Sequence, residues 1–164
     1  MATGIWFPDM AWQPAIGPWL FSVGGRRLAV NDRRQIHVLM IEDDPTIAEM
    51  YRLQLEHDGY VVSIATTGEI AESSIAADDP DVVLLDLLLP DRSGFEVLAS
   101  LNEVLPRHAP VVILSNYGEP SMMDRGRSLG AVEYLVKSRV TPADISRQIP
   151  TWIEQNRGGG PAES

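Results

Sequence analysis

The chain of 164 residues is long enough for one folded domain, and its 45% hydrophobic and 22% charged residues are ordinary for a globular protein. It contains no cysteine, which excludes disulfides, a thiolate nucleophile and a cysteine-based zinc site. Its formal net charge of −10 disfavours nucleic acid as a direct partner, and prolines or charges interrupt every apolar stretch, so we expect no membrane insertion.

Residues 1–34 differ in composition from the rest of the chain. They hold three of the four tryptophans and have prolines at positions 8, 14 and 18, a spacing that no regular helix or strand tolerates. The segment has no basic start, and Pro18 precedes its short apolar run, so it does not read as a signal peptide. We expect a poorly ordered leader; an aromatic docking arm is the alternative.

From Ile36 onward, short apolar runs alternate with segments of helical periodicity. The apolar runs predict five strands, at residues 36–41, 60–65, 82–86, 110–115 and 132–137. Caps and periodic apolar residues predict five helices, which begin near residues 45, 67, 95, 119 and 142. Residues 157–164 read as a flexible tail.

Three local signals qualify these helices. Asp44 is predicted to cap the first helix, with Pro45 at its first position. Gly126, in the interior of the fourth helix at 119–129, costs about 1 kcal/mol relative to alanine and predicts a weak helix. Pro150 is predicted to kink or divide the last helix.

Strands that alternate with helices indicate a parallel sheet with right-handed crossovers. We therefore predict an α/β fold, a doubly wound five-stranded parallel sheet with five helices. In the strand order 2-1-3-4-5, the first and third strands flank the point where the order reverses, which is where ligands bind in such sheets.

Chemically complementary side chains stand where four of these strands end. Glu42 and Asp43 follow the first strand, Asp86 ends the third, Ser115 ends the fourth and Lys137 ends the fifth. Three carboxylates at one edge repel one another, and a hard divalent cation such as Mg²⁺ relieves that repulsion. A remaining carboxylate could then attack phosphorus, with the lysine and the serine facing the phosphoryl oxygens. Each residue alone has an ordinary explanation as a cap, an exposed lysine or a turn serine.

Four pieces of the sequence carry a resemblance to a known family. They are VLMIEDDP at 38–45, DLLLPDRSG at 86–94, the single residue Ser115, and GAVEYLVK at 130–137. In this order and at this spacing, residues 35–156 resemble the receiver domain of two-component response regulators, which has a CheY-like, flavodoxin-like fold. The resemblance covers most of the chain beyond the leader.

The resemblance implies a role for each matching position. Asp86 would accept a phosphoryl group from a histidine kinase or a phosphotransfer protein. Asp43, Asp86 and the main-chain carbonyl of Leu88 would ligate Mg²⁺, and Glu42 would act through water. Lys137 would contact the phosphoryl group.

Ser115 would contact the phosphoryl group as well, and with Tyr134 it would form a switch pair in which the tyrosine ring turns inward. We expect no attached output domain, so the signal would leave through protein contacts on the surface made by the fourth helix, the fifth strand and the fifth helix. A homodimer, a place as a phosphorelay intermediate and a cytoplasmic location are further expectations.

The sequence departs from the family pattern at two positions. Ser138 replaces the proline that usually follows the lysine, so the usual cis peptide is not expected there. Asn116 stands where a small residue is usual. Leu88 and Tyr117, each two residues beyond a site residue, are large, and we predict that they shield the acyl phosphate from water.

Two other functions need residues that this sequence lacks. A Mg²⁺-dependent phosphatase of the haloacid-dehalogenase pattern needs a second acid at position 88, where leucine stands. A nucleotide- or flavin-binding domain needs a glycine-rich loop after the first strand, and the sequence has acids there. A receiver-like interaction module that is never phosphorylated remains an alternative. The three histidines (His37, His57 and His108) are expected to be structural or solvated.

Overall fold

A computed structural model of the chain describes residues 22–23, 26–27, 35–105 and 109–158. The pattern of contacts between residues divides the chain into two units, residues 1–34 and residues 35–164. Within the first unit, β1 (Ser22–Val23) and β2 (Arg26–Arg27) pair in antiparallel fashion, an element that the sequence analysis missed. The rest of the predicted leader lies outside the described residues.

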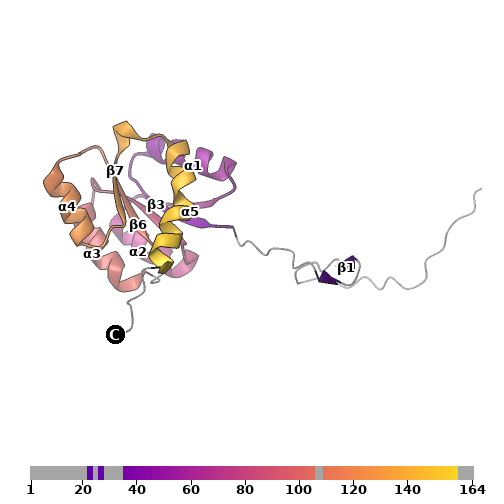
Figure 1. The fold of residues 1–164 in the computed structure, drawn as a ribbon. Helices are drawn as coiled ribbons and strands as arrows, with labels where there is room; N and C mark the ends of the chain where they lie inside the picture. The colour runs from indigo at the N-terminus through magenta and orange to yellow at the C-terminus, as the bar shows by residue number, and fades with distance from the viewer. Residues whose placement is uncertain (1–21, 24–25, 28–34, 106–108, 159–164) are drawn as a thin grey trace, which may run out of the picture. The chain divides into compact units, whose positions relative to one another are not determined.

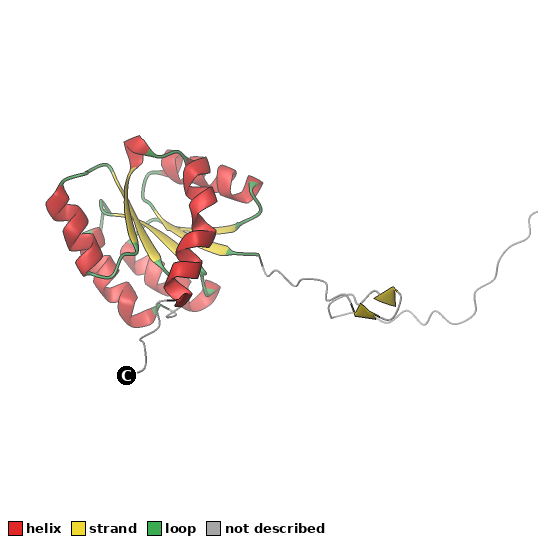
Figure 2. Ribbon diagram, viewed as in Figure 1, coloured by secondary structure: helices red, strands yellow, loops and turns green. Residues whose placement is uncertain are grey.

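The second unit is built on five parallel strands in the order β4-β3-β5-β6-β7 (Figures 1 and 2). They are β3 (His37–Ile41), β4 (Val61–Ala65), β5 (Val82–Asp86), β6 (Val111–Ser115) and β7 (Glu133–Val136). This confirms the predicted order 2-1-3-4-5 and all five predicted strands. Every strand except β5 is shorter than predicted at one or both ends, and Lys137 lies just beyond β7 in a 3₁₀ turn, η1 (Lys137–Arg139).

The burial of each strand follows from its place in the sheet. Every residue of β5 and β6 is buried, because both strands are central and helices cover both of their faces. At the sheet edge, β4 begins with the exposed Val61 and has three half-buried residues. The unbroken apolar run before Asp86 is thus the signature of a strand covered on both sides.

Five helices form the outer layers. They are α1 (Pro45–His57), α2 (Gly68–Asp78), α3 (Gly94–Val104), α4 (Pro120–Ser128) and α5 (Pro142–Gly158). Asp44 caps α1 as predicted, since its carboxylate accepts the N–H groups of Thr46 and Ile47. Ser93 and Glu96 form a reciprocal capping box on α3.

The core lies in two layers, one on each face of the sheet. Tyr51 and Leu55 of α1 pack with Ile149 and Trp152 of α5 on one face, and Figure 1 shows these two helices side by side. Residues of α2, α3 and α4 cover the other face. None of the described helices has the length and apolarity that crossing a membrane requires.

Gly126 has a packing role that the prediction of a weak helix overlooked. The residue is buried, and a Cβ atom there would lie 2.6 Å from Ile113 Cδ1 and 3.2 Å from Tyr134 Cδ2. The glycine therefore lets α4 approach the sheet over the ring of Tyr134. The free-energy cost of a glycine in a helix is offset here by the close packing of α4 on the sheet, which helix propensity alone does not reveal.

Pro150 lies inside α5 and does not divide it, and the helix continues to Gly158, beyond the predicted limit at residue 156. Proline cannot donate the hydrogen bond that the carbonyl of Ser146 would normally accept. The hydroxyl of Tyr60 donates to that carbonyl instead, at 2.8 Å. A side chain that enters from outside the helix thus satisfies the orphaned acceptor.

Candidate functional site

The strand register brings the predicted site residues to one edge of the sheet. Ile41, the last residue of β3, is level with Leu85, and Asp86 is level with Leu114. Ser115 is level with Val136. Because all the strands are parallel, Glu42, Asp86, Ser115 and Lys137 stand together at the carboxyl edge, as predicted.

An ion-pair cluster lies at the centre of this edge. The ammonium Nζ of Lys137 is 2.5 Å from Glu42 Oε2 and 2.9 Å from Asp86 Oδ2. Carboxylate oxygens of Glu42, Asp43 and Asp86 all lie within 4.8 Å of one another. Glu42 and Asp86 are buried, while Asp43 is exposed. The direct pairing of Glu42 with Lys137 is a contact that the sequence analysis did not predict.

Burial and charge act in opposite directions on this cluster. Loss of water raises the pKa of the Glu42 carboxyl, although the Lys137 ammonium acts to lower it. For Lys137, burial acts to lower the pKa, but the hydrogen bonds and charges of the two carboxylates outweigh it and raise the pKa. The lysine is therefore held charged between two acids.

The donor set of the cluster fits a hard divalent cation. One ammonium faces three carboxylates, so negative charge remains in excess at short range. All three acids offer oxygen, which Mg²⁺ prefers, and the exposed Asp43 leaves the cluster open to solvent. Leu88, also predicted as a ligand, follows in the same loop, and its N–H donates to Asp86 Oδ1 at 3.2 Å.

The main chain of Tyr117 connects the predicted switch residues. The N–H of Tyr117 donates to Ser115 Oγ at 3.1 Å, and its carbonyl accepts the Tyr134 hydroxyl at 2.8 Å. Ser115 and Tyr134 are both buried, so the tyrosine ring already occupies an inward position. Both side chains therefore hydrogen-bond to the main chain of the same residue, Tyr117.

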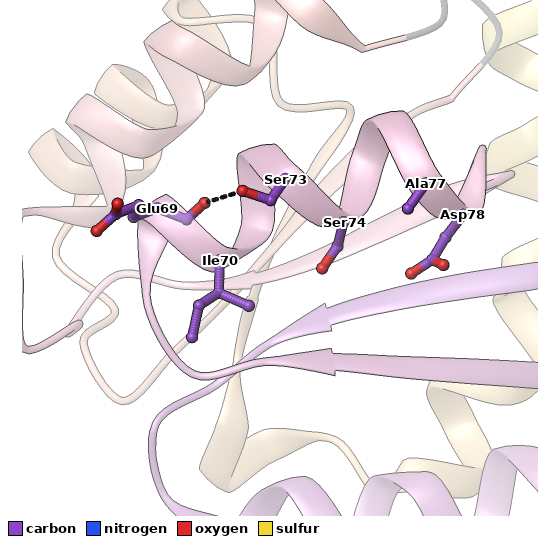
Figure 3. A pocket seen from close by; sticks show the side chains of 6 residues that line it. All are labelled: Glu69, Ile70, Ser73, Ser74, Ala77 and Asp78. Atoms are coloured by element: carbon purple, nitrogen blue, oxygen red, sulfur yellow. Dashed lines mark hydrogen bonds between the residues drawn. The ribbon is translucent and has the colours of Figure 1, made fainter.

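Other features lie away from the cluster. The ring of His37 bonds to Asp78 O and Ser63 Oγ, each at 2.9 Å, near the start of β3. That pairing is structural, as expected, and His108 lies outside the described residues. A surface hollow runs along α2, lined by Glu69, Ile70, Ser73, Ser74, Ala77 and Asp78 (Figure 3). None of the predicted site residues lines it.

Comparison with known proteins identifies the family. Residues 38–149 match the response regulator receiver domain. The transcriptional regulatory proteins KdpE of Mycobacterium tuberculosis and CseB of Streptomyces coelicolor are 42% and 35% identical over 100 and 103 residues, covering 61% and 63% of this chain. Each match covers 43% of the relative, so the chain spans less than half the length of these curated relatives.

Two solved structures are similar over nearly their whole length. A CheY-like receiver domain protein from Methanospirillum hungatei is 25% identical with a TM-score of 0.70, covering 77% of this chain and 99% of its own. The BeF3-activated N-terminal receiver domain of Klebsiella pneumoniae RstA is 26% identical with a TM-score of 0.67, covering 73% and 99%. The chain therefore belongs to the response regulator receiver domain family of two-component signalling proteins.

Proposed function

We propose that this receiver domain is a phosphorylation-dependent switch in which Asp86 is the phosphoacceptor. One observation carries the proposal: a buried carboxylate at the end of a central strand is held by Lys137 at 2.9 Å, beside two further acids. The donor is a phosphohistidine of a histidine kinase or of a phosphotransfer protein, and a receiver domain implies such a partner.

In the reaction, an Asp86 oxygen attacks phosphorus and the phosphorus–nitrogen bond of the donor breaks. The histidine nitrogen keeps the bonding electron pair, and an acyl phosphate forms on Asp86. Receiver domains bind Mg²⁺ at an acidic cluster, and when bound here by Glu42, Asp43 and Asp86 the ion would offset phosphoryl charge. Lys137, already within reach of Asp86, supplies a further positive charge to the phosphoryl oxygens.

We infer that Ser115 and Tyr134 transmit the change. When Ser115 turns its hydroxyl to the phosphoryl group, its hydrogen bond with the N–H of Tyr117 is lost. The carbonyl of Tyr117 accepts the Tyr134 hydroxyl, so a movement of Tyr117 reaches the tyrosine ring. The shift would reach α4 and β7, since Tyr134 packs under Gly126. The output partner, or a second copy of the chain, would then bind the surface of α4, β7 and α5.

The curated relatives are named as transcriptional regulators, so the expectation that nucleic acid is not a partner stays a prediction for this domain alone. The prediction rests on the net charge of this chain, −10, which carries no information about the part of the relatives that lies outside the match.

The proposal is tested by the intact mass of the protein after incubation with acetyl phosphate or phosphoramidate and Mg²⁺. We expect a gain of one phosphoryl group that EDTA or Asp86→Asn abolishes. Asp58→Asn, which removes an acid beyond the far end of α1, should leave the gain intact. If the folded wild-type protein gained no mass from either donor, that result would favour an unphosphorylated interaction module, or a domain that accepts a phosphoryl group only from its own kinase.

A further inference from the structure

The loop between β5 and α3, residues 87–93, is pinned at its base. The N–H of Gly94 donates to the Leu87 carbonyl at 2.9 Å, and Leu88 forms an antiparallel bridge with Ser93. A Cβ atom at position 94 would lie 2.5 Å from the carbonyl oxygen of Asp86, so only glycine permits this closure. The loop is thus a closed turn that starts directly after Asp86.

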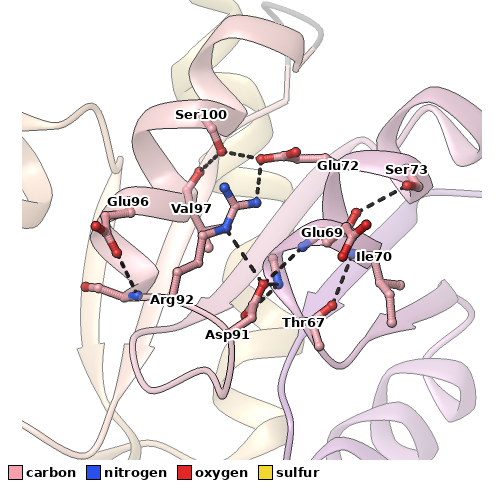
Figure 4. A network of polar contacts seen from close by, with 12 residues as sticks. Thr67, Glu69, Ile70, Glu72, Ser73, Asp91, Arg92, Glu96, Val97 and Ser100 are labelled. Carbon is pink, nitrogen blue, oxygen red and sulfur yellow. Dashed lines mark hydrogen bonds and ion pairs between the residues drawn. The ribbon is translucent and has the colours of Figure 1, made fainter.

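The far side of the same loop is attached to α2. The Asp91 carboxylate accepts the N–H of Gly68 at 3.0 Å and the N–H of Glu69 at 3.3 Å (Figure 4). These are the first two residues of α2, whose N–H groups have no acceptor within the helix. The hydrogen bond from Gly68 lowers the pKa of Asp91, so the carboxylate stays charged at neutral pH.

Arg92 adds a second attachment, shown in the same view (Figure 4). Its guanidinium is 2.6 Å from Glu72 Oε1, and the Ser100 hydroxyl donates to that oxygen at 2.6 Å. A Cβ atom at Gly68 would lie 2.6 Å from Arg92 Nε, so the absence of a side chain there makes room for the guanidinium. Arg92 therefore ties the loop to Glu72 of α2, and Glu72 in turn accepts a hydrogen bond from Ser100 of α3.

We propose that Asp91 and Arg92 are positioning residues that hold the main-chain carbonyl of Leu88 in place for the divalent cation. This inference rests on the proposed function, because that carbonyl is a ligand only if the acidic cluster binds the cation. Neither residue is itself a predicted ligand. They act through the loop, which is fixed at its base by Gly94 and on its far side by α2, so that less ordering is needed when the ion binds.

A purely structural role for the same contacts would be a tie between α2 and α3. Such a tie would change the stability of the domain and leave its affinity for Mg²⁺ unchanged. Affinity and stability must therefore be measured separately, on variants of matched chemistry.

The experiment measures the dissociation constant for Mg²⁺ by isothermal titration calorimetry, and the urea midpoint in EDTA, for the wild type, Asp91→Ala, Asp91→Asn and Arg92→Gln. Asp58→Ala is the control, because Asp58 also joins two segments through its carboxylate, 2.6 Å from Ser146 Oγ. We expect the dissociation constant to rise about tenfold in Asp91→Ala. Asp91→Asn keeps one acceptor oxygen, so its dissociation constant should lie between those of the wild type and Asp91→Ala. The dissociation constant of Asp58→Ala should equal that of the wild type.

Two outcomes would overturn the inference, and they are distinguishable. If the wild type binds Mg²⁺ and the Asp91 and Arg92 variants bind it equally well, the contacts are structural only, and the proposed function stands. If the wild type itself binds no Mg²⁺, the cation site fails and the inference fails with it. A variant whose circular dichroism shows loss of fold is replaced by the milder Asp91→Asn.

Discussion

Lys137 determines the electrostatic balance of the site at the scale of single residues. Its side chain is only 7% exposed, and it is paired with two carboxylates. Removing one partner of a buried ion pair leaves charges without compensation, which usually costs more than the pair itself contributes. Lys137→Met should therefore leave Glu42 and Asp86 facing each other as like charges.

We expect Lys137→Met to lower the free energy of unfolding by about 3 kcal/mol at pH 7 in EDTA, as urea denaturation would measure. Without the ammonium, the folded-state pKa of Glu42, already raised by burial, rises further above its ordinary value. An acid whose pKa is raised in the folded state stabilises the fold when it is protonated and destabilises it when it is charged. The loss of unfolding free energy in Lys137→Met, relative to the wild type, should therefore shrink toward pH 5 and grow toward pH 7. A deficit independent of pH would contradict this account.

Leu88 and Tyr117 support a second residue-scale prediction. The two residues are 51% and 43% exposed, and they lie two positions beyond Asp86 and Ser115 in sequence. If they shield the acyl phosphate, Leu88→Asn with Tyr117→Ala should lose the phosphoryl group severalfold faster, as followed by intact mass over time. Val104→Asn changes an exposed apolar residue on α3 and should leave the rate of phosphoryl loss unchanged. Equal rates for the double variant and the wild type would exclude shielding.

At the scale of elements, α5 depends on a contact with another segment. Tyr60 supplies the hydrogen bond that Pro150 cannot donate to the Ser146 carbonyl. In the wild type, Tyr60→Phe should therefore cost about 1 kcal/mol of stability through this lost bond. In a Pro150→Ala background, the alanine N–H can donate to the same carbonyl, so Tyr60→Phe should cost clearly less.

A double-mutant cycle by urea denaturation measures this coupling between Tyr60 and Pro150. Additive effects of the two changes would mean that the tyrosine hydroxyl does not replace the helical bond. Trp152, buried on the same helix, provides a fluorescence signal for the transition.

How far the sequence predicts the structure also depends on scale. Asp86 and Lys137 could be placed because each stands at the end of an apolar run, and parallel strands share an edge. The pairing of Lys137 with Glu42 could not, because β3 and β7 are not neighbours in the sheet and only the rotamer of a long side chain joins them. The packing role of Gly126 could not be predicted, because helix propensity does not include the packing of a helix against a tyrosine ring.

Contacts between a loop and a distant helix are hidden from sequence reasoning for a similar reason. Asp91 looks like a turn residue in the sequence, and its role at α2 depends on the packing of two segments 23 positions apart. Caps formed by neighbouring residues, such as Asp44 on α1, were predictable because their geometry is local.

At the scale of the whole molecule, we expect like-charge repulsion at the carboxyl edge to oppose folding when no cation is bound. Three carboxylates lie within 4.8 Å of one another, and one ammonium offsets only part of their repulsion. A ligand that binds the folded state alone stabilises it by mass action, about 2.7 kcal/mol at a hundredfold excess over its dissociation constant. The stability of the domain should thus report occupancy of the site without any phosphoryl donor.

We therefore expect Mg²⁺ to raise the urea midpoint of the wild type, and Asp43→Asn to lose that response. In EDTA, the same substitution should increase stability, on the order of 1 kcal/mol, because it removes one of the repelling charges. Glu154→Gln, an exposed acid of α5, should change neither quantity. The decisive result is that Asp43→Asn is more stable than the wild type in EDTA but gains no stability from Mg²⁺. A general loss of surface charge would not abolish the response to Mg²⁺. A damaged fold would lower stability both with Mg²⁺ and in EDTA.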